Sequence, residues 1–285
     1  MISWLTEPFS FAFMQRALVA SVIVGVVCAI IGCYIVLRSM AFLGDALAHS
    51  ILPGVAVAYL VGVNLLAGAL VAGLLVAIGI SFVSRAGTIK EDTAIGIFFA
   101  AALALGVVLI STMRTYAVDL THVLFGNVLG VTNADLWFSG GLAIVVLALV
   151  LFLYKKLLVV SFDAILGRTL GLNIHGLRTG LFLMLAATIV VALRTVGVAL
   201  VAAMLVTPPA AAYLVTRRLP VMMLVSAAIG VISSVAGLYA SYYLNVSSGG
   251  AIVLVATLIF VVAFLFAPRD GIVWRLRRRT ASVRG

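Results

Sequence analysis

The chain has 285 residues, of which 65% are hydrophobic and only 9% are charged, and its mean hydropathy is +1.35. Because a soluble domain carries roughly 25% charged residues, this composition excludes a soluble globular protein and indicates an integral membrane protein. The net charge of +10 does not indicate a nucleic-acid partner, since the basic residues lie in the links between apolar runs and at the C-terminus.

Nine apolar runs follow one another along the chain, and most reach the roughly 17–25 residues that a helix needs to cross a bilayer. Continuous runs of this length are typical of helices and not of the alternating pattern of a membrane barrel. We therefore predict an all-α, polytopic helical bundle of about nine transmembrane helices. The predicted spans are 17–37, 41–62, 65–84, 93–113, 137–154, 178–193, 196–216, 221–243 and 251–267.

The sixth run is the weak point of this count. It is short and has Arg194 at its end, so the segments 178–193 and 196–216 could instead form a broken or re-entrant pair. Totals of eight or ten helices are the alternatives.

The placement of lysine and arginine predicts the orientation. With the N-terminus outside, every basic residue except Arg16, Arg114 and Arg194 falls in an inner link or in the C-terminal tail. Cytoplasmic loops carry this excess of positive charge, so we expect the N-terminus outside and the tail inside.

Three parts are expected in the domain organisation. Residues 1–16 contain Trp4 and several phenylalanines that suit the headgroup level, which predicts an N-terminal interfacial segment. Residues 17–267 are expected to form the transmembrane domain, and residues 268–285 a basic cytoplasmic tail.

The second run carries the most informative residues. Asp45 and His49 are four residues apart, so a helix places the carboxylate and the imidazole on one face. A charged group at membrane depth is costly and by default marks a pathway or a site, and this oxygen and nitrogen pair suits a first-row divalent metal. The alternative is a satisfied pair that only fixes helix packing.

Pro53 strengthens the metal interpretation. It has no amide hydrogen, so the carbonyl of His49 is predicted to lose its helical partner and to become available. One copy of this set still offers too few ligands for a closed site. Two copies around a twofold axis would supply two carboxylates and two imidazoles, which predicts a homodimer.

A second polar pair, Asp119 and His122, lies on the outer side between the fourth and fifth runs. Their segment is too short in its apolar part for a full crossing, so a re-entrant or surface half-helix is expected. The two residues are interpreted either as ligands at an outer gate or as a structural pair in a solvated loop.

The inner link at 161–173 has the character of a short amphipathic helix. Ser161 or Asp163 can cap it, an apolar face includes Ile165 and Leu170, and its glycines permit close approach. It is interpreted as a docking helix for a soluble partner or, equally, as an ordinary membrane-surface helix. The candidate docking residues are Ser161, Phe162, Asp163, Leu166, Gly167, Arg168 and Gly171.

Pro208 and Pro209 fall inside the seventh run and predict a break or a kink there. The carbonyls of Met204 and Leu205 would be released and could line a path, although conformational machinery is the favoured interpretation. The sequence has no phosphate-binding Gly-Lys-Ser/Thr loop and no hydrolase motif, so the chain is not expected to be an enzyme.

Four stretches in this order resemble the zinc/manganese permease family of ATP-binding-cassette importers. They are Gly32-CYIVLRSMAFLGDALAHSILPGVAVAY, Asp92-TAIGI, Asp119-LTHVLFGN and Thr195-VGVALVAAMLVTPPAAAYL. The similarity extends over almost the whole chain. The block around Asp45 and His49 and the Leu-Phe-Gly-Asn block are specific together.

The resemblance implies a permease of the bacterial inner (plasma) membrane, with the type II fold of vitamin B12 importers. It implies a homodimer that works with a separate cytosolic ATP-binding subunit and an extracytoplasmic metal-binding protein, and that otherwise contacts membrane lipid. The 161–173 link would be the coupling helix. Asp45 and His49 would bind the transported ion, Mn²⁺ or Zn²⁺ and possibly iron, with no permanently bound cofactor. A metal carrier driven by an ion gradient is the alternative function.

Overall fold

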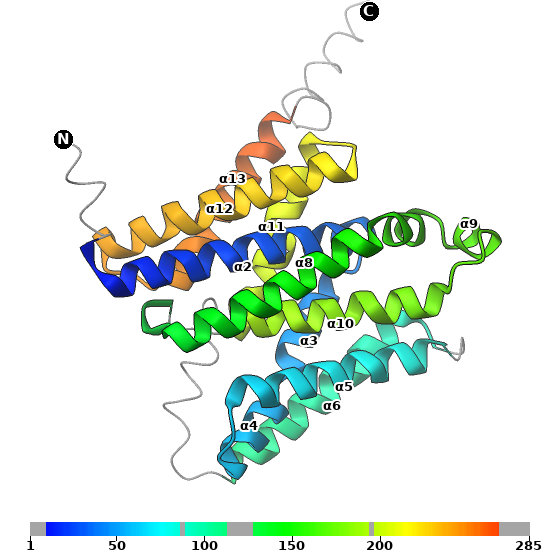
Figure 1. The fold of residues 1–285 in the computed structure, drawn as a ribbon, viewed down its shortest axis with the longest axis horizontal. Coiled ribbons are helices and arrows are strands. Elements are labelled where there is room, and N and C mark those ends of the chain that lie inside the picture. Colours follow the sequence, from blue (N-terminus) through cyan, green and yellow to red (C-terminus); the bar gives the residue numbers. More distant parts are fainter. Residues whose placement is uncertain (1–9, 86–88, 113–127, 194–196, 268–285) are drawn as a thin grey trace, which may run out of the picture.

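The computed structural model describes residues 10–85, 89–112, 128–193 and 197–267, and within these ranges the chain is helical, without a β-strand (Figure 1). The helices are α2 (Ala12–Leu37), α3 (Ala41–Ser50), α4 (Leu52–Val61), α5 (Leu65–Arg85), α6 (Glu91–Ser111), α8 (Asn133–Phe162), α9 (Ala164–Thr169), α10 (Ile174–Leu193), α11 (Val198–Val215), α12 (Leu219–Leu244) and α13 (Ser248–Phe266), with a 3₁₀ turn η2 (Val128–Gly130).

Eight segments in the described ranges are long and apolar enough to cross a membrane, with α3 and α4 together forming one of them. The remaining predicted run, 196–216, corresponds to α11, of which Val201–Val215 is a shorter apolar helix. The all-α, multi-pass prediction is confirmed. The first span begins at Ala12, earlier than the predicted residue 17.

Helices that are distant in the sequence pack side by side. In Figure 1 the helices α12, α2, α8, α10 and α5 follow one another across the molecule, and each is in contact with the next. The most buried segments are α2, α3–α4 and α10, each with 67% of its apolar window inside, whereas α6, α8 and α13 bury only 22%. The described core is therefore built around α2, α3 and α10.

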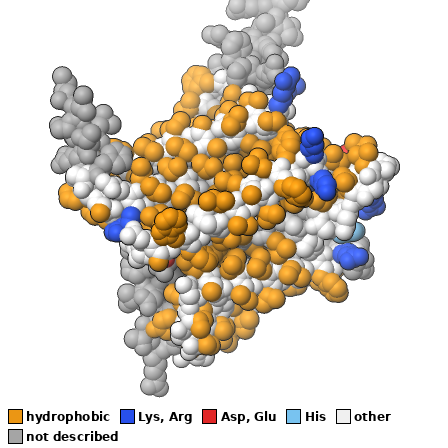
Figure 2. Space-filling model, in the orientation of Figure 1, with side chains coloured by type: hydrophobic (Ala, Val, Ile, Leu, Met, Phe, Trp, Pro, Cys, Tyr) orange, Lys and Arg blue, Asp and Glu red, His pale blue; other side chains and the backbone are white. Residues whose placement is uncertain are grey.

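The surface agrees with a membrane protein. Figure 2 shows a broad hydrophobic surface between the two ends of the molecule, with most of the visible lysine and arginine side chains near the end where α9 lies. This distribution matches the predicted orientation, in which α9 and its neighbours face the cytoplasm.

Glycines allow the central helices to approach one another closely. An added Cβ on Gly32 of α2 would lie 2.0 Å from the carbonyl oxygen of Leu205 in α11, and one on Gly54 of α4 would lie 2.2 Å from that of Gly68 in α5. Small residues at crossings serve membrane helices because packing, and not the hydrophobic effect, holds them together.

The prediction for Pro208 and Pro209 is a break or a kink. Helix α11 runs through both prolines from Val198 to Val215, so the structure excludes a break. The carbonyl of Leu205, which Pro209 leaves without a helical donor, lies against Gly32. It therefore packs in a helix crossing and does not line a path.

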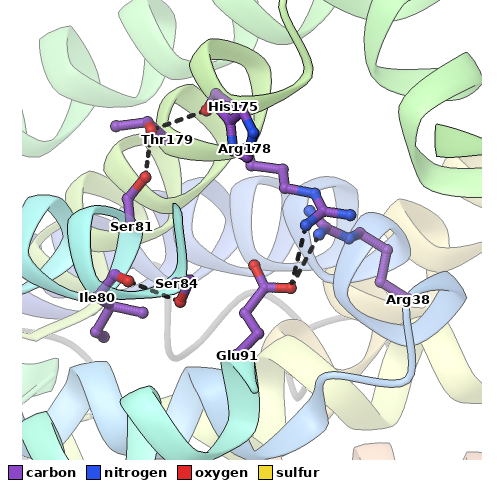
Figure 3. Close-up of polar contacts among 8 residues, drawn as sticks. All are labelled: Arg38, Ile80, Ser81, Ser84, Glu91, His175, Arg178 and Thr179. Carbon is purple, nitrogen blue, oxygen red and sulfur yellow. Dashed lines mark hydrogen bonds and ion pairs between the residues drawn. The ribbon is translucent and has the colours of Figure 1, made fainter. Parts of the chain in front are cut away.

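A cluster of charges joins three helices at the inner end (Figure 3). The Arg38 guanidinium, directly after α2, lies 3.5 Å from Oε2 of Glu91 at the start of α6, and Nη1 of Arg178 in α10 lies 3.9 Å from the same oxygen. Nearby, the hydroxyls of Ser81 in α5 and Thr179 in α10 are hydrogen-bonded to each other. The inner ends of α2, α5, α6 and α10 are thus linked by polar contacts.

Burial makes Glu91 the key member of this cluster. The side chain of Arg38 is only 7% exposed, and desolvation lowers the pKa of Arg38, an effect that the positive Arg178 reinforces and the negative Glu91 opposes. The negative charge of Glu91 therefore stabilises the charged guanidinium of Arg38 at this buried position.

The substitution Gly32→Ala should destabilise the protein by about 1–3 kcal/mol, because the new methyl group would overlap the backbone of α11. Thermal unfolding of the purified protein in detergent measures the effect. The control is Gly141→Ala, at an exposed position of α8 where an added Cβ meets nothing within 4 Å. Equal unfolding temperatures for the two variants would contradict the close-packing interpretation.

The substitution Glu91→Gln should lower stability by about 1–3 kcal/mol, because it leaves two neighbouring guanidinium groups without their shared carboxylate. Asp92→Asn is the matched control, since Asp92 is the next residue of the same helical turn and is exposed. Chemical denaturation of both variants in detergent compares them. A loss of the same size in Asp92→Asn would point to the helix terminus and not to the cluster.

Candidate functional site

Asp45 and His49 lie on one face of α3, as the sequence predicts. The distance from Nε2 of His49 to Oδ1 of Asp45 is 3.6 Å, and their side chains are 25% and 39% exposed, respectively. This separation is longer than an ordinary hydrogen bond, so the carboxylate and the imidazole are neighbours that are not hydrogen-bonded to each other. Both remain able to bind a third group placed between or beside them.

The second ring nitrogen of His49 supports this interpretation. Its Nδ1 is buried and has no hydrogen-bond partner among the described residues. A pair whose only role was to glue helices together would be expected to satisfy its buried polar atoms. The alternative of a purely structural pair is therefore the weaker one.

The rest of α3 explains why this face is open. Leu43, Leu47 and Ala48 are buried, and Gly44 approaches the side chain of Leu205 in α11. Helix α3 therefore packs through its small and aliphatic side against α11. The polar pair occupies the side that is only partly covered.

Pro53 interrupts the span directly after the pair. Helix α3 ends at Ser50, Ile51 separates the helices, and Pro53 lies in the first turn of α4. The Ser50 hydroxyl donates to the carbonyl of Ala46 at 2.6 Å, so it is engaged within the helix. The boundary between α3 and α4 places the pair at the end of a short helix, where the amide of Ile51 is directed at the carbonyl of His49 that the sequence predicts to be free.

An aromatic ring of α6 packs against the imidazole of His49. The Phe99 ring of α6 meets His49 edge to face, with centroids 5.9 Å apart, and also meets Phe42 of α3 at 5.7 Å. Sequence reasoning missed these contacts, because nothing in the apolar pattern of 93–113 distinguishes Phe99 from its neighbours.

One chain supplies few metal ligands. No cluster of three or more His, Cys, Asp or Glu side chains occurs within the described parts of the chain. Asp119 and His122, the predicted outer pair, fall outside the described residues. Among the described residues, the candidate ligand set of one copy is therefore the carboxylate of Asp45 and the imidazole of His49.

The inner link has the predicted helix. Asp163 is the N-cap of α9, and its Oδ1 accepts hydrogen bonds from the amides of Ile165 at 2.8 Å and Leu166 at 3.0 Å. Ser161, the other candidate cap, belongs instead to the last turn of α8 together with Phe162.

Of the two glycines expected to permit close approach, Gly167 does so, whereas Gly171 has open space around it and serves a turn. Gly171 adopts a φ of +71°, in the left-handed region that favours glycine. Gly167 is buried, and an added Cβ would lie 2.6 Å from Ile174 at the start of α10. Helix α9 is thereby held against α10.

Helix α9 presents an apolar surface outward. The side chains of Phe162, Ile165, Leu166 and Leu170 are all exposed, and Arg168 is exposed beside them. This surface lies at the basic end of the molecule. Its geometry fits docking into a groove of a soluble protein, and it equally fits contact with lipid headgroups.

Comparison with known proteins identifies a matching family and similar membrane transport proteins. The model of the ABC 3 transport family matches residues 10–267. The chain is 47% identical over 275 residues to the manganese transport system membrane protein MntC of Halalkalibacterium halodurans, covering 95% of this chain and 94% of that protein. It is 39% identical over 288 residues to the chelated iron transport system membrane protein YfeC of Yersinia pestis, covering 99% and 98%.

A solved structure shows the same fold. PsaBC from Streptococcus pneumoniae, in complex with Fab, superposes with a TM-score of 0.85 at 39% identity, covering 95% of this chain and 98% of that chain. The predicted resemblance is confirmed. The chain belongs to the ABC 3 transport family and is a multi-pass permease of the bacterial plasma membrane.

Proposed function

We propose that this permease moves a divalent transition-metal ion across the membrane and that Asp45 and His49 bind the ion during its passage. The observation that carries the proposal is the half-exposed carboxylate and imidazole pair, 3.6 Å apart on an otherwise apolar helix. A pair of this kind offers an oxygen and a nitrogen ligand and suits Mn²⁺, Fe²⁺ and Zn²⁺. The manganese and iron named for the relatives agree with this range.

The ligand count supports a homodimer. Two protein ligands hold a dehydrated divalent ion poorly, since such ions prefer four to six donors. The partly exposed face of α3 leaves room for the same face of a second copy. Two copies would bring two carboxylates and two imidazoles together around one axis.

The chain itself is proposed to hydrolyse no ATP. As the membrane subunit of an ATP-binding-cassette importer, it would depend on a cytosolic ATPase that docks on α9 and on an extracytoplasmic protein that delivers the metal. ATP binding and hydrolysis in the partner would move α9 and switch the dimer between its outward-facing and inward-facing states. The site must bind the ion tightly enough to replace water and weakly enough to release it.

The substitution Asp45→Asn should lower Mn²⁺ uptake at least about 100-fold, because it removes the charged oxygen ligand while keeping the side-chain volume. Uptake is measured with cells that express the complete transporter, and the amount of assembled permease is measured in the same membranes. Ser50→Ala is the control, since Ser50 is buried on the same helix and bonds only within it. Undiminished uptake by Asp45→Asn would remove the site proposal.

The double substitution Phe162→Ala with Leu166→Ala should weaken binding of the cytosolic ATPase about tenfold or more, because exposed apolar anchors dominate such interfaces. Affinity is measured with the purified permease in nanodiscs. Leu151→Ala with Phe152→Ala removes a similar exposed apolar surface from α8, within the membrane, and should leave ATPase binding unchanged. Unchanged binding in the variant with Phe162 and Leu166 replaced would favour a membrane-surface role for α9 and the end of α8.

A further inference from the structure

We infer that Phe99 is a positioning residue that orients the imidazole of His49 for metal binding. The inference rests on the proposed function, in which His49 is a ligand of the transported ion. It concerns how a ring on α6, distant from α3 in the sequence, fixes the direction in which that ligand points.

A histidine that binds a metal usually has its other ring nitrogen held by a hydrogen bond to a carboxylate or carbonyl, which fixes the ring. His49 lacks that support, because its Nδ1 is buried and has no partner among the described residues. The contact of its Nε2 with Asp45 at 3.6 Å is too long to fix the ring by itself. Something else must hold the imidazole.

Ring packing supplies the missing constraint. The Phe99 and His49 centroids are 5.9 Å apart with an interplanar angle of 68°, which is the edge-to-face arrangement that aromatic pairs favour. Rotation of the imidazole about its Cβ–Cγ bond would replace this contact with a less favourable one. The phenyl ring therefore restricts the orientation of both ring nitrogens.

The Phe99 ring also packs against Phe42 of α3, the helix that carries Asp45 and His49. The two rings meet at 5.7 Å and 77°, and Phe42, Asp45 and His49 share one face of α3 at spacings of three and four residues. Phe99 thus contacts two rings that flank Asp45 along this face. This placement distinguishes it from a general packing residue of α6.

The adjacent residue provides a matched comparison. Phe98 is also half-buried on α6, but its ring lies against Gly79 of α5. Truncation of either ring removes the same number of atoms from the same helix. Only truncation of Phe99 should change the behaviour of His49.

The test measures Mn²⁺ binding to the full-length permease in nanodiscs, from the electron paramagnetic resonance signal of the free ion. Phe99→Ala should raise the Kd about threefold to tenfold, and pulsed measurements should show weaker coupling of bound Mn²⁺ to the imidazole nitrogen. Phe99→Tyr should restore both quantities, because it keeps the ring. Phe98→Ala should leave both unchanged.

An unchanged Kd and nitrogen coupling in Phe99→Ala would overturn the inference, as would equal changes in Phe98→Ala. Two further variants separate this inference from the proposal on which it rests. If Asp45→Asn and His49→Ala abolish binding while Phe99→Ala has no effect, only the positioning role fails. If those two variants bind Mn²⁺ as the wild type does, the metal site itself fails and the positioning role with it.

Discussion

The energetic cost of a carboxylate at membrane depth is the constraint from which the other features of the site follow. Hydrocarbon offers no water to solvate Asp45, so the group must have a partner, a water-filled path or a second subunit. Among the described residues, the ion-pair partner of Asp45 is His49, on the next turn of α3 and too distant for a strong hydrogen bond. The site is therefore incomplete in one chain, and an ion with its remaining ligands would complete it.

The site on α3 and the charge cluster at the inner end differ in their electrostatics. Asp45 and His49 lie among apolar residues of α3 such as Leu43, Leu47 and Ala48. At the inner end, Glu91 is instead shared by two guanidinium groups, Arg38 and Arg178. The first arrangement is left open for a ligand, whereas the second is already neutralised within the protein.

The sequence predicts most of the fold but less of the site. Apolar run length and arginine placement suffice for the spans and their orientation, because each depends on local composition. The spacing of Asp45 and His49 predicts their shared face for the same reason. Phe99 and the partners of Glu91 could not be predicted, since they depend on which helices become neighbours. Pro208 and Pro209 suggest a break that the structure does not have, because α11 continues through both prolines while packing closely against Gly32 of α2.

Helix α6 connects these two regions. Glu91 opens the helix and Phe99 follows eight residues later, a rise of about 12 Å. At its inner end the helix is tied through Arg178 to α10, which directly follows α9. Under the proposed docking of a soluble partner on α9, a displacement of α9 would act first on α10 and then, through the contact between Arg178 and Glu91, on the helix that carries Phe99.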